Sequence, residues 1–144
     1  MELASLDEFD RLHEVNVRAP YWLTQQLLPL LKACRGQVVF VNSTQALDAR
    51  ASTGQYAATQ HARRAMAESL RSEVNPDGVR VLALYLGRTA SALQAKIFRD
   101  EGRPYDADLL LQPSEIAAVI GHCMTLPTTA EVTNLTLRPA IKSY

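Results

Sequence analysis

Apolar residues recur along this chain with two different periods, and the change of period marks the predicted elements. Residues 37–42 and 79–85 are nearly unbroken apolar runs, which are typical of strands buried on both faces. Residues 131–137 alternate apolar and polar side chains, which favours a strand at the edge of a sheet. The segments around these runs have a helical period. Strands that alternate with helices predict a parallel sheet with right-handed crossovers.

The predicted helices are bounded by local start and stop signals. Ser5 and Glu8 have the spacing of a capping box, and Pro20 is expected to kink or restart the first helical segment. Gly36 should end that segment, and Pro113 suits the first turn of the last helix. The first expected helix starts at residue 5. The other four cover residues 21–31, 56–74, 92–101 and 113–126. On the third of these, the side chains expected to pack inward are Ala62, Ala65, Leu70 and Val74.

Length and charge limit the classes of protein that fit. The chain has 144 residues, 47% of them apolar, which is consistent with one globular domain over residues 1–144. Fifteen basic and fifteen acidic residues cancel, so no charge excess indicates nucleic acid or a membrane surface as a partner. No apolar run approaches membrane-spanning length and no signal-peptide core is visible, so we expect a cytoplasmic protein. The cysteines and histidines lack metal-ligand spacing.

Three residues have a spacing that suits acid–base chemistry. Ser43 directly follows the first predicted strand, and a hydroxyl at the carboxyl end of a parallel strand points into the crevice where open α/β sheets bind ligands. Tyr56 and Gln60 are one helical turn apart. A serine can hydrogen-bond a substrate oxygen while a tyrosine exchanges a proton with it. A cation at ~4 Å would favour a phenolate by ~4 kcal/mol at an effective dielectric constant of ~20, but Gln60 is uncharged.

Several motifs together carry a resemblance to a known family. They are residues 6–10 with Glu14-Val15-Asn16-Val17, the strand 38–43, Tyr56-Ala57-Ala58-Thr59, the strand 79–85 with the loop 86–91, and residues 131–135. In this order, the whole chain resembles the second, C-terminal half of a short-chain dehydrogenase/reductase. The glycine-rich turn of the family's first half has no counterpart here. The resemblance thus implies a partial Rossmann-like, doubly wound parallel sheet of about three strands, without the nucleotide-binding half.

The resemblance also implies roles for individual residues. Asn16 would support a proton-relay water, Ser43 would polarise the substrate oxygen, and Tyr56 would be the acid/base. Gln60 stands where the family has lysine. The nicotinamide of NAD or NADP would lie against Gly87, Thr89 and Ser91. Hydroxyls in such a loop, however, more often form local hydrogen bonds that cap the loop itself. Leu86 replaces a proline in the same loop. Two alternatives stay open: Thr44 as the hydroxyl in place of Ser43, and Arg63, seven residues after Tyr56, as the missing cation.

Two functional hypotheses follow. The first is an oxidoreductase of this family that interconverts small carbonyl compounds and alcohols with NAD(P), inactive as an isolated chain. The second is a non-catalytic pseudoenzyme that dimerises or complements a partner; a fragment without independent function is a third reading. The expected partners are a second copy or the missing half, since the first two long helices form a dimer interface in related enzymes. The expected apolar helix face comprises Trp22, Leu27, Leu28, Leu30 and Leu31.

Overall fold

The computed structural model describes residues 4–141, and its centre is a three-stranded parallel sheet. The strands are β1 (Gln37–Ser43), β2 (Arg80–Leu86) and β3 (Asn134–Leu137), in the order β1-β2-β3. Val39 pairs with Leu82, and Ser43 pairs with Leu86 at the carboxyl end. The predicted parallel sheet and the edge position of its last strand are therefore confirmed.

The third strand is shorter than the pattern predicted, because it begins at Asn134 and not at residue 131. The reason lies in the hydrogen bonds just before it. The main-chain oxygen of Thr133 accepts from Ala83 N at 2.9 Å, as in a ladder. Two residues earlier, the side chain of Glu131 accepts from Val81 N at 2.8 Å. A carboxylate thus satisfies the β2 amide that a longer strand would have paired through its backbone.

The first helical segment contains a π turn. Helix α1 (Leu6–His13) is followed by the π turn Glu14–Arg18 and by α2 (Ala19–Cys34), with Pro20 in the first turn of α2. The backbone is helical at both junctions, so the predicted kink or restart at Pro20 takes the form of a π turn just before α2 and not of a separate helix start. Only half of the predicted capping box forms: Ser5 Oγ accepts from Glu8 N at 3.4 Å, whereas the Glu8 carboxylate pairs with Arg11 at 2.6 Å.

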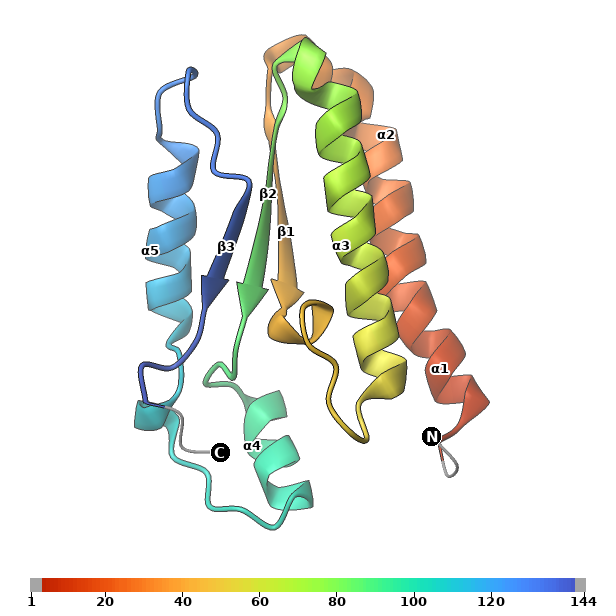
Figure 1. Ribbon diagram of the computed structural model, residues 1–144, viewed down its shortest axis with the longest axis vertical. Coiled ribbons are helices and arrows are strands. Elements are labelled where there is room, and N and C mark those ends of the chain that lie inside the picture. The colour runs from red at the N-terminus through yellow and green to blue at the C-terminus, as the bar shows by residue number, and fades with distance from the viewer. Residues whose placement is uncertain (1–3, 142–144) are drawn as a thin grey trace.

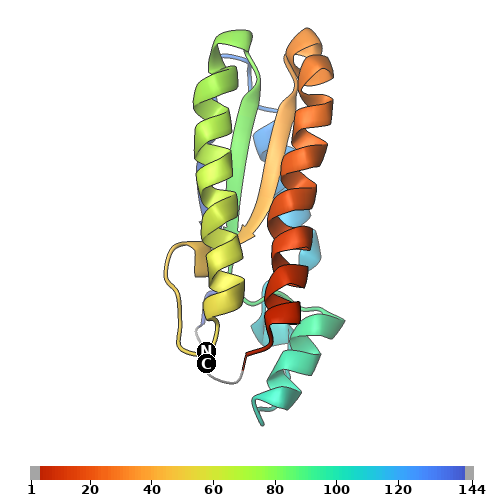
Figure 2. The same ribbon diagram turned by 90° about the vertical axis from the view of Figure 1, so that its right-hand side faces the viewer.

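The remaining helices are α3 (Gly54–Val74), α4 (Ala92–Asp100) and α5 (Pro113–Met124). Helices α2 and α3 lie side by side over one face of the sheet, and α5 lies on the other face (Figures 1 and 2). Side chains of α3 meet β1 and β2 in a core formed by Phe40, Val81, Ala83, Tyr85, Ala67, Leu70 and Val74. Ala65, which we expected in this core, is exposed. It lies on the side of α3 away from the buried stripe of Ala67, Leu70 and Val74.

Two apolar surfaces remain uncovered among residues 4–141. On β1 the side facing α3 is packed, but Val41 on the opposite side is exposed. Helix α5 packs against Leu84, Leu135 and Leu137, and it meets β1 only near the amino end of that strand, at Gln37. The prediction that this strand is buried on both faces was therefore wrong. On α2, Trp22, Leu27 and Leu30 are exposed, while Leu28 and Leu31 pack against the core. The expected helix face is thus divided between surface and interior.

In the part of the chain that the structure describes, no helix has both the length and the apolar character needed to cross a membrane.

Candidate active site

The candidate site residues gather at the carboxyl edge of the sheet. Parallel pairing brings Ser43 at the end of β1 beside Leu86 at the end of β2. Helix α3 begins at the same end, so that Tyr56 lies in its first turn, and α4 lies below this edge (Figure 1). The loop with Gly87, Thr89 and Ser91 leaves β2 here. Residues far apart in the sequence are therefore brought to one edge by topology alone.

The hydroxyl of Ser43 caps the short 3-10 helix that follows β1. Its Oγ accepts from Gln45 N at 3.2 Å, and the Ser43 amide donates to Asn42 Oδ1 at 2.8 Å. Within residues 4–141 the Ser43 hydroxyl donates no hydrogen bond of its own. Its proton therefore remains free for an external oxygen. Thr44, the alternative hydroxyl, is the first residue of the same 3-10 helix and is also half-buried.

Tyr56 and Gln60 have opposite environments although they are one turn apart. Tyr56 is 38% exposed, and among the described residues its phenol has no hydrogen-bond partner. Gln60 is 1% exposed, and its Nε2 donates to Thr59 Oγ1 at 3.3 Å. Tyr56 can therefore meet a ligand in solution, whereas Gln60 is held inside the protein.

Thr59 is the centre of a hydrogen-bond network that the sequence did not predict. Its Oγ1 accepts from Asn16 Nδ2 at 3.1 Å and from Gln60 Nε2, and donates to the main-chain oxygen of Tyr56 at 2.8 Å. Asn16 lies within the π turn, and π turns are frequent at functional sites. The network joins the π turn to the first turns of α3, and so orients the turn that carries Tyr56. A visible signal was a threonine on the buried face of α3, inside the tyrosine motif.

Asn42 is the second residue that sequence reasoning missed. It is 4% exposed, and its Nδ2 donates to the main-chain oxygen of Gln60 at 3.1 Å. Since its Oδ1 accepts from the Ser43 amide, one side chain connects the end of β1 to α3. Asn42 therefore sets the distance between the strand that carries Ser43 and the helix that carries Tyr56.

Hydrogen bonds and close packing order the loop after β2. Thr89 Oγ1 donates to Gly87 O at 3.2 Å, and Ser91 Oγ donates to Thr89 O at 3.4 Å while it caps α4. A side chain at Gly87 would lie 3.1 Å from Arg138 Cα, so this glycine allows a close approach of the chain after β3. Beyond it, Arg88 forms an ion pair with Glu101 at 2.7 Å and stacks on Phe98. These contacts fasten α4 to the loop.

Arg63 lies on the same stripe of α3 as the buried residues Gln60 and Ala67, and is itself half-buried. Burial lowers the pKa of its guanidinium, and the charge of Tyr56 acts in the opposite direction. Its Nε is inaccessible to solvent and has no hydrogen-bond partner in the described part of the chain.

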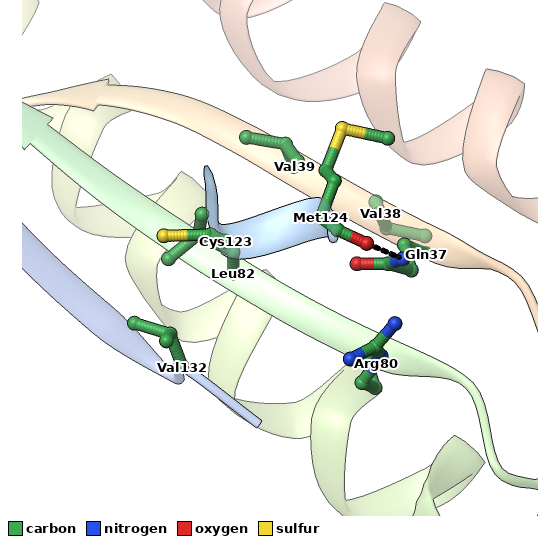
Figure 3. Close-up of a pocket in the computed structure, with 8 residues that line it drawn as sticks. All are labelled: Gln37, Val38, Val39, Arg80, Leu82, Cys123, Met124 and Val132. Carbon is green, nitrogen blue, oxygen red and sulfur yellow. Dashed lines mark hydrogen bonds between the residues drawn. The ribbon is translucent and has the colours of Figure 1, made fainter. Parts of the chain in front are cut away.

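Two hollows lie elsewhere on the molecule. A cavity of about 10 Å³ lies near the amino ends of the strands, between Arg80, Cys123 and Met124, where Gln37 Nε2 donates to Met124 O at 2.9 Å (Figure 3). That volume suits about one water molecule. A wider surface groove runs along α1 and the π turn, lined by Asp10, His13, Glu14, Val17 and Arg18. Neither hollow includes the residues at the carboxyl edge.

The sequence matches the short chain dehydrogenase family over residues 1–102. The chain belongs to this family. It is 27% identical over 139 residues to a short-chain type dehydrogenase/reductase of Sinorhizobium fredii. The aligned region covers 94% of this chain and 56% of the relative. It is 36% identical over 115 residues to a short-chain dehydrogenase of Penicillium crustosum, covering 76% and 41% of the two chains.

Solved structures of short-chain dehydrogenases have the same architecture. An alcohol dehydrogenase from the archaeon Thermococcus sibiricus, complexed with 5-hydroxy-NADP, is 25% identical with a TM-score of 0.84. The match covers 100% of this chain and 59% of the archaeal one. The Rossmann-like character of the three-stranded sheet is thereby confirmed. The chain spans about half the length of the curated relatives that it matches.

The described residues suit one end of a dinucleotide. Thr89 and Ser91 donate through long hydrogen bonds of 3.2 and 3.4 Å to neighbouring carbonyls, and such weak bonds can be exchanged for a carboxamide oxygen. The pyrophosphate of a dinucleotide is usually held by a glycine-rich turn at a helix N-terminus. The sequence contains no such turn. The residues present therefore fit the nicotinamide end only.

Proposed function

We propose that this chain carries the carbonyl- or alcohol-handling part of an NAD(P)-dependent oxidoreductase of the short-chain dehydrogenase family. The observation that carries the proposal is the convergence of Ser43, Tyr56 and the Gly87 loop at one carboxyl edge. The likeness to an alcohol dehydrogenase complexed with 5-hydroxy-NADP supports it. The adenosine and pyrophosphate of the cofactor are held by other polypeptide, equivalent to the part of the relatives that this chain does not match.

Each residue then has a role that follows from its environment. The free proton of the Ser43 hydroxyl donates a hydrogen bond to the substrate oxygen. The exposed phenol of Tyr56 gives its proton to that oxygen when a carbonyl is reduced and takes it back when an alcohol is oxidised. When bound, NAD(P)H would supply the hydride that reduces the carbonyl carbon. Asn16 and Thr59 hold the first turn of α3, and Thr89 and Ser91 bind the carboxamide.

The decisive experiment combines the chain with a polypeptide that covers the unmatched part of the Thermococcus enzyme. Oxidation of NADPH by aldehydes and ketones is followed by the loss of absorbance at the nicotinamide band. We expect turnover that Tyr56→Phe and Ser43→Ala each reduce by about 100-fold or more. Tyr105→Phe is the matched control, since Tyr105 has a similar exposure and lies in the loop after α4. Equal rates for Tyr56→Phe and the unmodified chain would contradict the proposal.

The chain alone should bind the dinucleotide only weakly. Its donors reach one end of the cofactor, so we expect a Kd in the millimolar range or above for NADPH in calorimetric titration. A Kd in the micromolar range would show that another surface of this chain binds the phosphates.

A second function is favoured by specific observations: a non-catalytic protein that acts through association. Gln60 is buried and bonded to Thr59, so it does not reach the carboxyl edge as a ligand contact. Leu30 on α2 is 68% exposed, beside Trp22 and Leu27, which is more apolar surface than a helix normally leaves in water. Under this alternative the chain dimerises or completes a partner. It predicts a stable complex in which Tyr56→Phe has no effect on any measured function.

A further inference from the structure

The apolar side of α4 is covered at one end of the helix and bare at the other. Phe98, near the end of the helix, is only 4% exposed. Arg88 and Arg103 lie over its ring, and Tyr105 meets the ring edge-on. Leu93, in the first turn of the helix, is 68% exposed. The uncovered apolar end of α4 is therefore the end that adjoins the loop after β2.

The position of Leu93 in the chain places it beside the candidate site. Ser91, which caps α4 and belongs to the proposed nicotinamide loop, lies two residues before Leu93. Helix α4 itself lies at the carboxyl end of the sheet (Figures 1 and 2). Helical side chains lean toward the N-terminus of their helix, so the side chain of Leu93 leans toward the cap and the loop. Its exposed apolar surface therefore continues the carboxyl edge that carries Ser43 and Tyr56.

The three segments that form this edge contain no charged side chain. They are residues 43–47 after β1, residues 51–56 at the start of α3, and residues 89–95 after β2. Their polar groups are hydroxyls and amides, which recognise a neutral oxygen. Leu47 in the first segment is 42% exposed, so apolar surface is available on the β1 side as well. This composition suits a ligand that is uncharged and partly apolar.

The basic side chains next to residues 89–95 already have carboxylate partners. Arg88 pairs with Glu101 at 2.7 Å, and Lys96 pairs with Asp100 at 3.2 Å. Each cation would have to leave its carboxylate before it could bind the carboxylate of a substrate. These two pairs therefore offer little attraction to an anionic substrate.

We propose that the substrate is an uncharged carbonyl compound or alcohol with a hydrocarbon chain, and that Leu93 selects for that chain. The hydroxyls of Ser43 and Tyr56 bind the substrate oxygen, and Leu93 contacts the chain beyond the reacting carbon. Each methylene group buried against apolar surface raises the affinity by up to about fourfold. The catalytic part of this inference rests on the proposed function, whereas the contact between Leu93 and a hydrocarbon chain does not.

The first test measures binding to the chain alone, without cofactor or turnover. Leucine methyl groups labelled with ¹³C are followed by NMR, and Leu93→Ala assigns the signals of Leu93. Because it has four more methylene groups, methyl hexyl ketone should shift these signals at a concentration about tenfold or more below that needed for butanone. Octanoate, with the same number of carbons but a negative charge, should bind at least several-fold more weakly than the ketone.

Leu30 on α2 is the matched control, because it is also 68% exposed but does not lie at the carboxyl edge. Its methyl signals should not shift over the concentration range that shifts those of Leu93. An equal response of Leu30 and Leu93 would overturn the inference, since it would mean that the ketone contacts any exposed leucine. Binding of octanoate as tight as that of the ketone would overturn the assignment of an uncharged substrate.

The second test uses the complemented chain and follows the oxidation of NADPH. Leu93→Ala should lower kcat/KM for methyl hexyl ketone by about fourfold or more through a higher KM, and change the value for butanone less than twofold. Leu93→Met, which keeps the apolar surface, should restore the preference. Since Leu93 is exposed, these substitutions should leave the fold intact. Turnover with an unchanged preference in Leu93→Ala would overturn the inference. Lack of turnover, with the NMR result as expected, would count against the proposed function alone.

Discussion

Replacing Asn42 by alanine removes the side chain that ties β1 to α3. In the structure its Oδ1 accepts from Ser43 N at 2.8 Å and its Nδ2 donates to the main-chain oxygen of Gln60 at 3.1 Å. The bond to Gln60 is buried and the bond to Ser43 is partly buried, and alanine satisfies neither group. One hydrogen bond contributes about 1 kcal/mol, and a buried amide left without a partner costs about 1 to 3 kcal/mol. We therefore expect Asn42→Ala to lower the free energy of unfolding by about 2 to 4 kcal/mol.

Urea denaturation followed by circular dichroism measures this loss. With a slope of about 1 to 3 kcal/mol per molar urea, the midpoint should fall by roughly 0.7 to 4 M. Asn75→Ala is the control, since Asn75 is exposed beyond the end of α3 and should change stability by less than about 0.5 kcal/mol. A loss below 0.5 kcal/mol in Asn42→Ala would refute the reasoning, because it would mean that water replaces both bonds without cost.

Three further predictions concern packing, burial and association. Gly87→Ala should destabilise the fold by about 1 to 3 kcal/mol, because the added methyl group would lie 3.1 Å from Arg138 Cα. Gly121→Ala in α5 should instead stabilise the fold by about 0.5 to 1 kcal/mol, because a methyl group there has nothing within 4 Å and alanine favours the helix. Gln60→Lys should lower the urea midpoint, because it places an ammonium at a position that is 1% exposed; an unchanged midpoint would show that the lysine reaches solvent. The double variant Leu27→Glu and Leu30→Glu should weaken self-association, measured by sedimentation equilibrium at tens of micromolar, whereas the control Leu93→Glu on α4 should not. If the unmodified chain is monomeric under these conditions, the expectation is wrong.

The apolar pattern along the chain predicted where the strands lie, but it did not predict which helices cover the faces of those strands. Runs at residues 37–42 and 79–85 predicted two strands, and the structure contains both, because a local run of apolar residues reflects burial in any fold. The same pattern wrongly predicted that both faces of the first strand are covered. Whether Val41 is buried depends on where α5 lies, and α5 is more than seventy residues away in the sequence.

The candidate site divides in the same way. Ser43 and Tyr56 were found from their positions after a strand and within a helical motif, and both are local properties. Thr59 and Asn42 were missed as linking residues because their partners are distant: Asn16 bonds Thr59 across 43 residues, and Asn42 bonds Gln60 across 18. Such hydrogen bonds form only after two elements have packed together, so neither side chain can be recognised as a link from its local sequence.

By itself, the sequence determined the helices, the strands and the parallel topology, since these follow from residue spacing within short segments, and its motifs carried the resemblance to the family. The tertiary structure decided the environments of the charged and polar groups. It buried Gln60, exposed Tyr56 one turn away and left Arg63 half-buried on the same stripe of α3. The physical reason is that solvation and Coulomb interaction depend on the distance to groups of other elements, and packing sets those distances.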